Sequence, residues 1–111
     1  MLDTTPLTAA TDRFADRLRG APQSRLQQGA AAVALDLARE LSVRAQRLDG
    51  TAGDADGGEA RIMPDAGVFV VADQLTVAAE DLAEALRTAP SRVELDEAVR
   101  SVGEAVARAR L

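Results

Sequence analysis

The sequence predicts an all-α protein, a small four-helix bundle with a flexible Gly/Asp-rich crossover loop between its second and third helices. Apolar residues recur at spacings of three and four through four separate stretches. Residues that start and end helices bracket each stretch. A segment with no large apolar side chain, residues 49–60, separates the second stretch from the third. We expect one helical domain over residues 1–111, with the flexible loop at 49–61.

The first predicted helix covers about residues 5–19. Thr5 supplies a capping hydroxyl, and Pro6 occupies the first turn, where its missing N–H donor costs nothing. Gly20 ends this helix and Pro22 opens the second, which runs to about residue 48. The short connection predicts a tight, roughly antiparallel corner.

The third predicted helix, about residues 66–88, carries the longest buried stripe and is expected to be central. Asp65 is its expected N-cap. A small β-hairpin over residues 62–71 is an alternative, because Pro-Asp-Ala-Gly suits a turn and a β-branched run follows. We prefer the helix because the stripe continues without a break through its last member. Its members are Val68, Val71, Ala72, Leu75, Ala78, Ala79, Leu82 and Leu86.

The fourth predicted helix covers about residues 91–110. Ser91 and Glu94 have the spacing of a capping box, in which the serine accepts from the N3 amide and the glutamate bonds back to the serine N–H. This motif predicts the start of the helix more sharply than any other boundary in the chain.

The composition argues against an enzyme and against a bound metal or cofactor. The chain has no His and no Cys, and it also lacks Tyr, Lys and Trp, so no catalytic motif is recognisable. Only an oxygen-ligand site for Ca²⁺ or Mg²⁺ remains conceivable, and the loop from Asp54 to Asp65 fits a calcium site poorly. Glu59 stands where an EF-hand loop requires glycine. We therefore expect no metal and no cofactor.

Charge and hydropathy restrict the partners and the location. A formal charge of −5 disfavours a protein that neutralises nucleic-acid phosphates. No apolar run is long enough to span a membrane, and the N-terminal residues do not resemble a signal peptide, so we expect a cytoplasmic protein. All thirteen basic residues are arginine and alanine is abundant, which indicates a GC-rich bacterial genome.

Arg44 is the sharpest candidate for a polar site, because it interrupts the apolar stripe of its helix. If the helices at 22–48 and 66–88 run antiparallel, Arg44 comes close to Asp73. Gln74 would add hydrogen-bonding groups, and the three residues would form a polar spot in an apolar pocket. The competing interpretation is a structural ion pair, or two solvated side chains.

A second cluster of charges surrounds the first helical corner. Arg13, Arg17, Arg19 and Arg25 gather there and would suit a phosphate or an acidic partner. Because Asp12 and Asp16 interleave with them in the sequence, we favour a mixed surface over a binding patch.

Surplus apolar residues lead to the functional hypothesis. Several large apolar side chains fall off the stripes that one small bundle needs. We therefore expect a non-catalytic protein–protein interaction module, a homo-oligomer such as a homodimer or a subunit of a complex. The alternative is a bundle that binds or senses a small molecule in a pocket near the start of the third helix. The interface candidates are Leu35, Val43, Phe69, Val70, Val77 and Val93.

Overall fold

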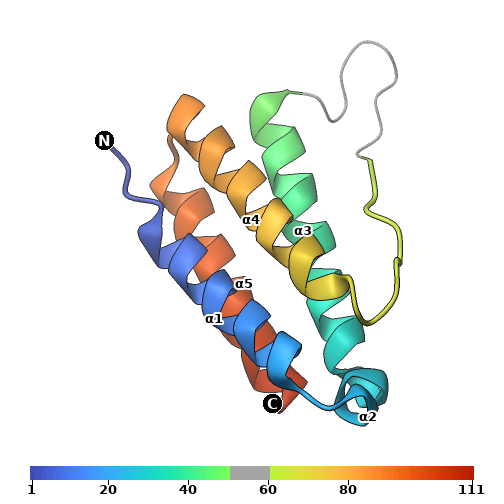
Figure 1. Ribbon diagram of the computed structural model, residues 1–111. Coiled ribbons are helices and arrows are strands. Elements are labelled where there is room, and N and C mark those ends of the chain that lie inside the picture. Colours follow the sequence, from blue (N-terminus) through green and yellow to red (C-terminus); the bar gives the residue numbers. More distant parts are fainter. Residues whose placement is uncertain (51–60) are drawn as a thin grey trace.

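The computed structural model describes residues 1–50 and 61–111 of the chain (Figure 1). Four long α-helices form a bundle, α1 (Thr5–Gly20), α3 (Ala31–Asp49), α4 (Val71–Thr88) and α5 (Arg92–Ala109). Between α1 and α3 lie a single turn, α2 (Gln23–Arg25), and a π-helical turn, η1 (Leu26–Ala30). The described residues contain no strand. The predicted all-α bundle is confirmed, whereas most of the predicted flexible loop, residues 51–60, lies outside the described residues.

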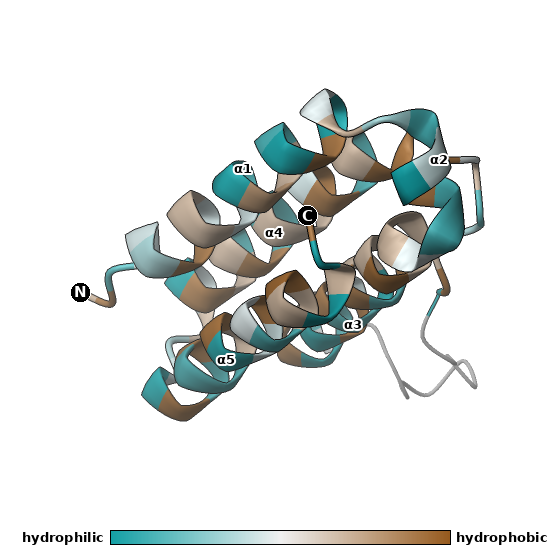
Figure 2. Ribbon diagram, turned by 90° about the horizontal axis from the view of Figure 1, so that it is seen from below, coloured by the Kyte–Doolittle hydropathy of each residue, from teal (hydrophilic) through white to brown (hydrophobic). Residues whose placement is uncertain are grey.

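The helices pack as a ring. The helix α4 packs against α3 and α1, and α5 packs against the same two helices from the other side. Hydrophobic residues turn inward, and the outer side of α1 is largely hydrophilic (Figure 2). The largest fully buried side chains come from all four helices and form the core: Phe14, Leu7, Leu18, Leu41, Leu75, Leu82, Leu86 and Val102. Within residues 1–50 and 61–111, no helix combines the length and apolar character needed to cross a bilayer.

The helices α3 and α4 run parallel, which corrects the antiparallel arrangement considered for them. The chain leaves α3 at one end of the bundle, and residues 61–70 return along its side before α4 begins at the other end (Figure 1). Hydrogen bonds to α3 follow this return. The Arg61 carbonyl accepts from Gln46 late in α3, and the Met63 carbonyl accepts from Arg39, which lies one to two turns earlier in that helix. A helix of 19 residues is about 28 Å long, a distance that the connection is long enough to cover.

The third predicted helix begins five residues late, at Val71 instead of 66. Gly67 adopts a φ of 97°, outside the helical region, and Val70 N–H bonds to the Gly67 carbonyl in a turn. Asp65 Oδ1 accepts a hydrogen bond from Gly67 N at 2.9 Å, so this carboxylate caps the turn and not the helix. The alternative hairpin over 62–71 is also wrong, since none of these residues is in a strand.

The second predicted helix, 22–48, is not continuous. Gly29 has φ 145° and ψ −21°, which breaks the helix within η1, two residues before α3 begins. Only glycine adopts such a conformation without strain. The sequence pattern did not reveal this break, because apolar spacing continues on both sides of it.

The caps of α5 and α1 each differ in part from the prediction. Ser91 Oγ accepts from Glu94 N at 3.1 Å, as expected. The Glu94 carboxylate, however, binds Arg44 on α3, so no reciprocal capping box forms. At the start of α1, Thr5 does not act as the cap, and Asp3 Oδ1 instead accepts from Thr5 N at 3.0 Å. The hydrogen bond from the Thr5 side chain, and then that from the Thr5 amide, lower the pKa of Asp3.

Candidate functional site

The structure separates Arg44 from Asp73, so the predicted pair is wrong. Arg44 lies late in α3, beside the start of α5, whereas Asp73 lies in the first turn of α4 at the other end of the bundle. Asp73 Oδ1 instead accepts a hydrogen bond from Arg19 Nη2 of α1 at 2.8 Å. Both side chains of that pair are well exposed to solvent. The parallel course of α3 and α4 is the reason for the separation.

Arg44 is the centre of a charge cluster that joins α3 to α5. Its Nε donates to Glu40 at 3.0 Å, and its Nη1 donates to Glu94 and, at 3.3 Å, to Glu97. Partial burial lowers the pKa of the guanidinium, but its hydrogen bonds to Glu94, Glu40 and Glu97 outweigh this effect and raise that pKa above its ordinary value. The cluster therefore has the character of a structural ion pair, the competing interpretation of Arg44.

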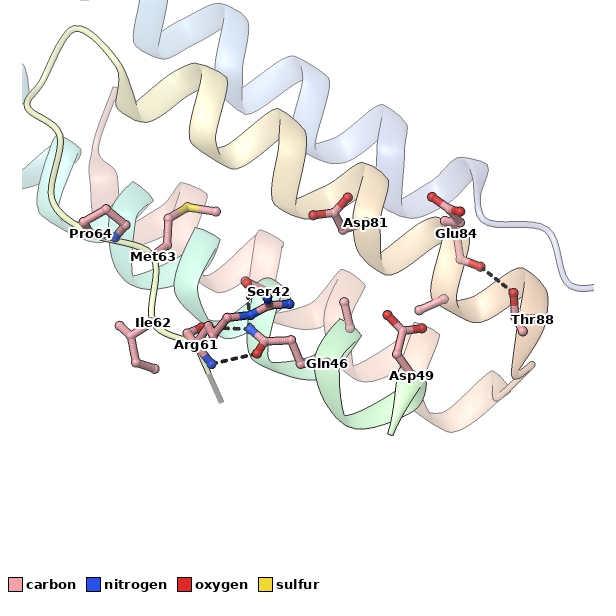
Figure 3. Close-up of a pocket in the computed structure, with 12 residues that line it drawn as sticks. Ser42, Gln46, Asp49, Arg61, Ile62, Met63, Pro64, Asp81, Glu84 and Thr88 are labelled. Carbon is pink, nitrogen blue, oxygen red and sulfur yellow. Dashed lines mark hydrogen bonds between the residues drawn. The ribbon is translucent and has the colours of Figure 1, made fainter. Parts of the chain in front are cut away.

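A hollow of about 460 Å³ lies between the last turns of α3 and α4 and the returning chain (Figure 3). The Gln46 side chain exchanges hydrogen bonds with the main chain of Arg61, donating to its carbonyl at 2.8 Å and accepting from its amide at 2.7 Å. Carboxylates from both helices, Asp49, Asp81 and Glu84, also line the hollow. They do not converge, and no metal-binding group of acids exists within the described parts of the chain.

A second hollow, of about 310 Å³, opens at the start of α4, where the sequence predicted a pocket. Leu26, Leu35 and Val71 supply apolar walls, and the polar side chains that line it are Gln27, Asp65 and Gln74. Gln74 Nε2 donates to the Pro64 carbonyl at 2.8 Å. Its Oε1 is buried and accepts no hydrogen bond from any described residue. Of the predicted polar residues, Arg44 and Asp73 lie outside this hollow.

The six interface candidates divide into exposed and covered residues. Phe69 is 78% exposed, Val77 54% and Val93 66%, whereas Leu35 is only 8% exposed. Leu35 belongs to the core, so its assignment as an interface residue is wrong for the isolated chain, and Val43 is half-buried. Phe69 and Val70 lie in the turn that leads into α4, and Val70 is the N-cap residue of that helix. Val77 follows Val70 by seven positions, a spacing that places the two on the same side of the helix. We call Phe69, Val70 and Val77 the α4 patch.

An apolar groove of about 360 Å³ runs between α1 and α5. Phe14 and Val102 are buried in its floor, and Val99 and Val106 are half-buried beside them. Arg13 and Arg17 line the groove from α1, whereas Asp12 and Asp16 do not. Arg17 and Arg25 line the neighbouring hollow. We call the first of these hollows the α1/α5 groove.

The cationic residues that the sequence grouped together thus point to different places. Arg19 faces α4 and binds Asp73, with Asp16 at 3.5 Å as a second partner. Arg13 and Arg17 form no ion pair with any carboxylate in residues 1–50 and 61–111. Sequence reasoning missed this distinction because it depends on which side of α1 faces α5.

Comparisons with protein families, with curated protein sequences and with solved structures find no match to this chain.

Proposed function

We propose that this protein is a non-catalytic helical interaction module that self-associates through the α4 patch. The observation that carries the proposal is the exposure of Phe69, in the turn before α4, and of Val77, on α4, a helix whose other side is fully packed. Burial of one such large apolar side chain contributes roughly 1.5–3 kcal/mol, so a contact that covers both has a substantial driving force. The proposal also places the module in a bacterial cytoplasm, on the basis of the sequence alone.

The chemistry of the described side chains supports a binding role over a catalytic one. Arg44 is held by three carboxylates, and Arg19 is held by Asp73. Catalysis by acids alone needs carboxylates of unequal pKa facing a common space. Asp49, Asp81 and Glu84, the acids nearest to that description, stand apart around an open hollow.

The molar mass in solution, measured by light scattering over a range of concentrations, tests the proposal. The wild-type protein should exceed the 11.6 kDa of one chain and grow with concentration. The double variant Phe69→Asp/Val77→Asp should remain at one chain mass, because each aspartate puts a charge into the contact. Val93→Asp is the matched control, since it makes the same kind of change at an exposed valine outside the α4 patch. A wild-type protein that stays at 11.6 kDa throughout contradicts self-association.

A second candidate function, binding of a small molecule at the start of α4, is favoured by Gln74. The orientation of its amide is determined, because the Pro64 carbonyl can only accept a hydrogen bond and Nε2 must donate it. The buried Oε1 therefore remains an acceptor beside the apolar walls formed by Leu35 and Val71. A small apolar molecule with one hydrogen-bond donor matches this arrangement.

Thermal shift with phenol and with toluene tests the second candidate. Phenol should raise the melting temperature more than toluene, because only phenol donates a hydrogen bond to Gln74 Oε1. Gln74→Met should abolish the difference between the two probes while the protein stays folded. Equal shifts with both probes in the wild-type protein contradict a role for Gln74.

A further inference from the structure

We propose that the α1/α5 groove receives the α4 patch of a second copy of this chain, so that copies associate head to tail. The inference rests on the proposed function, because it names the surface that the α4 patch contacts. It follows from the composition of the two surfaces. The groove has an apolar floor and a cationic rim, whereas the α4 patch is apolar and is followed along α4 by exposed carboxylates.

The α1/α5 groove combines an apolar floor with a cationic rim. Phe14 and Val102 form the floor, and Arg13 and Arg17 stand one helical turn apart above it. At Gly103, on the α5 wall, no atom beyond its chain neighbours and the nearby backbone of α5 lies within 4 Å of the place that a Cβ would occupy. The groove is therefore open along this wall, and two guanidinium groups without an ion pair in the described chain line its rim. Such a site suits a helix surface that carries both apolar and acidic side chains.

The α4 patch continues into an acidic surface of this kind. Glu80 and Glu84 are exposed, and their spacing places them on the same side of α4 as Val77. Neither glutamate has an ion-pair partner among the described residues. One side of α4 thus offers exposed apolar side chains followed by exposed carboxylates, the complement of the α1/α5 groove.

A symmetric contact between two α4 patches is disfavoured by the same charges. In an antiparallel contact centred on Val77, Asp73 of one copy lies opposite Asp81 of the other. Facing carboxylates repel, and the repulsion grows when water is removed from between them. Docking into the α1/α5 groove instead brings Glu80 and Glu84 towards Arg13 and Arg17.

The two surfaces belong to different sides of the ring of helices. The helix α4 packs against α1 and α3 (Figure 1). The groove lies between α1 and α5. A contact between them is heterologous, so each copy keeps one surface free for a further copy until a ring closes. Association should therefore continue beyond a dimer as the concentration rises.

Two complementary variants test the pairing of the surfaces. Arg13→Glu/Arg17→Glu reverses the charge of the groove and retains the α4 patch, whereas Phe69→Asp/Val77→Asp retains the groove and disables the patch. Each variant alone should have the 11.6 kDa mass of one chain in light scattering. An equimolar mixture should form a pair of twice that mass and stop there, because one functional groove then meets one functional patch. The control Arg47→Glu/Arg108→Glu changes the same charge at two exposed arginines outside the groove and should associate like the wild type.

A further variant blocks the groove without reversing a charge. Gly103→Gln extends a long side chain into the open wall of the groove, and replacement of a mid-helix glycine also favours the folded state. We expect it to abolish association while its melting temperature is equal to or above that of the wild type.

The light-scattering results distinguish failure of the head-to-tail inference from failure of self-association itself. If Arg13→Glu/Arg17→Glu and Gly103→Gln still self-associate while Phe69→Asp/Val77→Asp does not, the α4 patch acts without the groove and the head-to-tail inference is wrong. If the wild type never exceeds one chain mass, self-association itself fails. Formation of the mixed pair supports both the proposed function and the head-to-tail inference. Its affinity should fall several-fold or more between about 0.05 M and 0.5 M salt, because added ions screen the arginine–glutamate attraction.

Discussion

The Gln46 side-chain amide on α3 exchanges two hydrogen bonds with the main chain of Arg61, at 2.8 and 2.7 Å. This contact attaches the returning chain to α3 at the first of the described residues 61–111. Arg39 Nε adds a bond to the Met63 carbonyl at 2.8 Å, and Gln74 Nε2 adds one to the Pro64 carbonyl. Three side chains thus hold residues 61–64 along the bundle, which is the route that makes α3 and α4 parallel.

Gln46→Ala is expected to destabilise the protein by about 1–3 kcal/mol, because it leaves main-chain groups of Arg61 without their partners. Unfolding in urea measures the change. Gln28→Ala, at an exposed glutamine, is the control and should alter stability by less than about 0.5 kcal/mol. Amide exchange at Arg61 should accelerate in the Gln46 variant alone. Equal effects of the two substitutions would mean that the Gln46 contact adds nothing to stability.

Arg44→Ala is expected to cost about 1–3 kcal/mol, because Glu40, Glu94 and Glu97 then lose their shared counter-charge. The side chain of Arg44 is only 18% exposed, so water replaces the lost hydrogen bonds poorly. Arg47→Ala removes an exposed arginine from the same helix and should change stability by less than about 0.5 kcal/mol. Chemical denaturation of the two variants side by side would disprove this account if they unfolded at the same midpoint.

Gly29 and Gly103 should respond in opposite directions to alanine. At neither residue does an atom beyond the chain neighbours and the nearby helix backbone lie within 4 Å of the place that a Cβ would occupy, so steric contact does not distinguish them. Gly29 has a φ of 145°, where an alanine is strained, and Gly29→Ala should destabilise by at least about 1 kcal/mol. Gly103 lies inside α5, and Gly103→Ala should stabilise by about 0.5–1 kcal/mol. The melting temperatures of the two variants should therefore lie on either side of the wild-type value, and a shift in the same direction would contradict the backbone argument.

The carboxyl group of Asp3 should titrate with a pKa below its ordinary value of 3.8, because it accepts hydrogen bonds from Thr5 in its ionised form. A carboxyl whose pKa is depressed on folding stabilises the native state above its unfolded pKa, and that contribution is lost as the pH falls through the lowered value. A titration of Asp3 by NMR checks the direction of the shift. The Thr5 amide resonance should follow the same titration and should lose this dependence in Asp3→Asn.

The helical stripes and the core were predictable from the sequence, because both depend on spacings of three and four residues. The stripe from Val71 to Leu86 is buried as its periodicity indicated. Val77 and Phe69 are exposed, as their positions off the stripes suggested. Such features follow from the geometry of one helix, which is the same whatever the helix packs against.

The partners of the polar residues were not predictable, because they depend on the course of the chain between helices. Arg44 contacts Glu94, fifty positions later in the sequence, and Arg19 contacts Asp73. A connection as long as that between Gly50 and Val71 permits either direction for the next helix.

Four amphipathic helices around one apolar core could be inferred from residue spacing alone, since each stripe is a local property of its own helix. The folded chain was needed to show that α3 and α4 are parallel and that Arg44 belongs to a cluster with α5. It was also needed to show that Arg13 and Arg17 line the α1/α5 groove while Arg19 faces α4. The physical reason is that burial of a stripe is satisfied by any apolar neighbour, whereas hydrogen bonds and ion pairs require particular atoms to meet at about 3 Å.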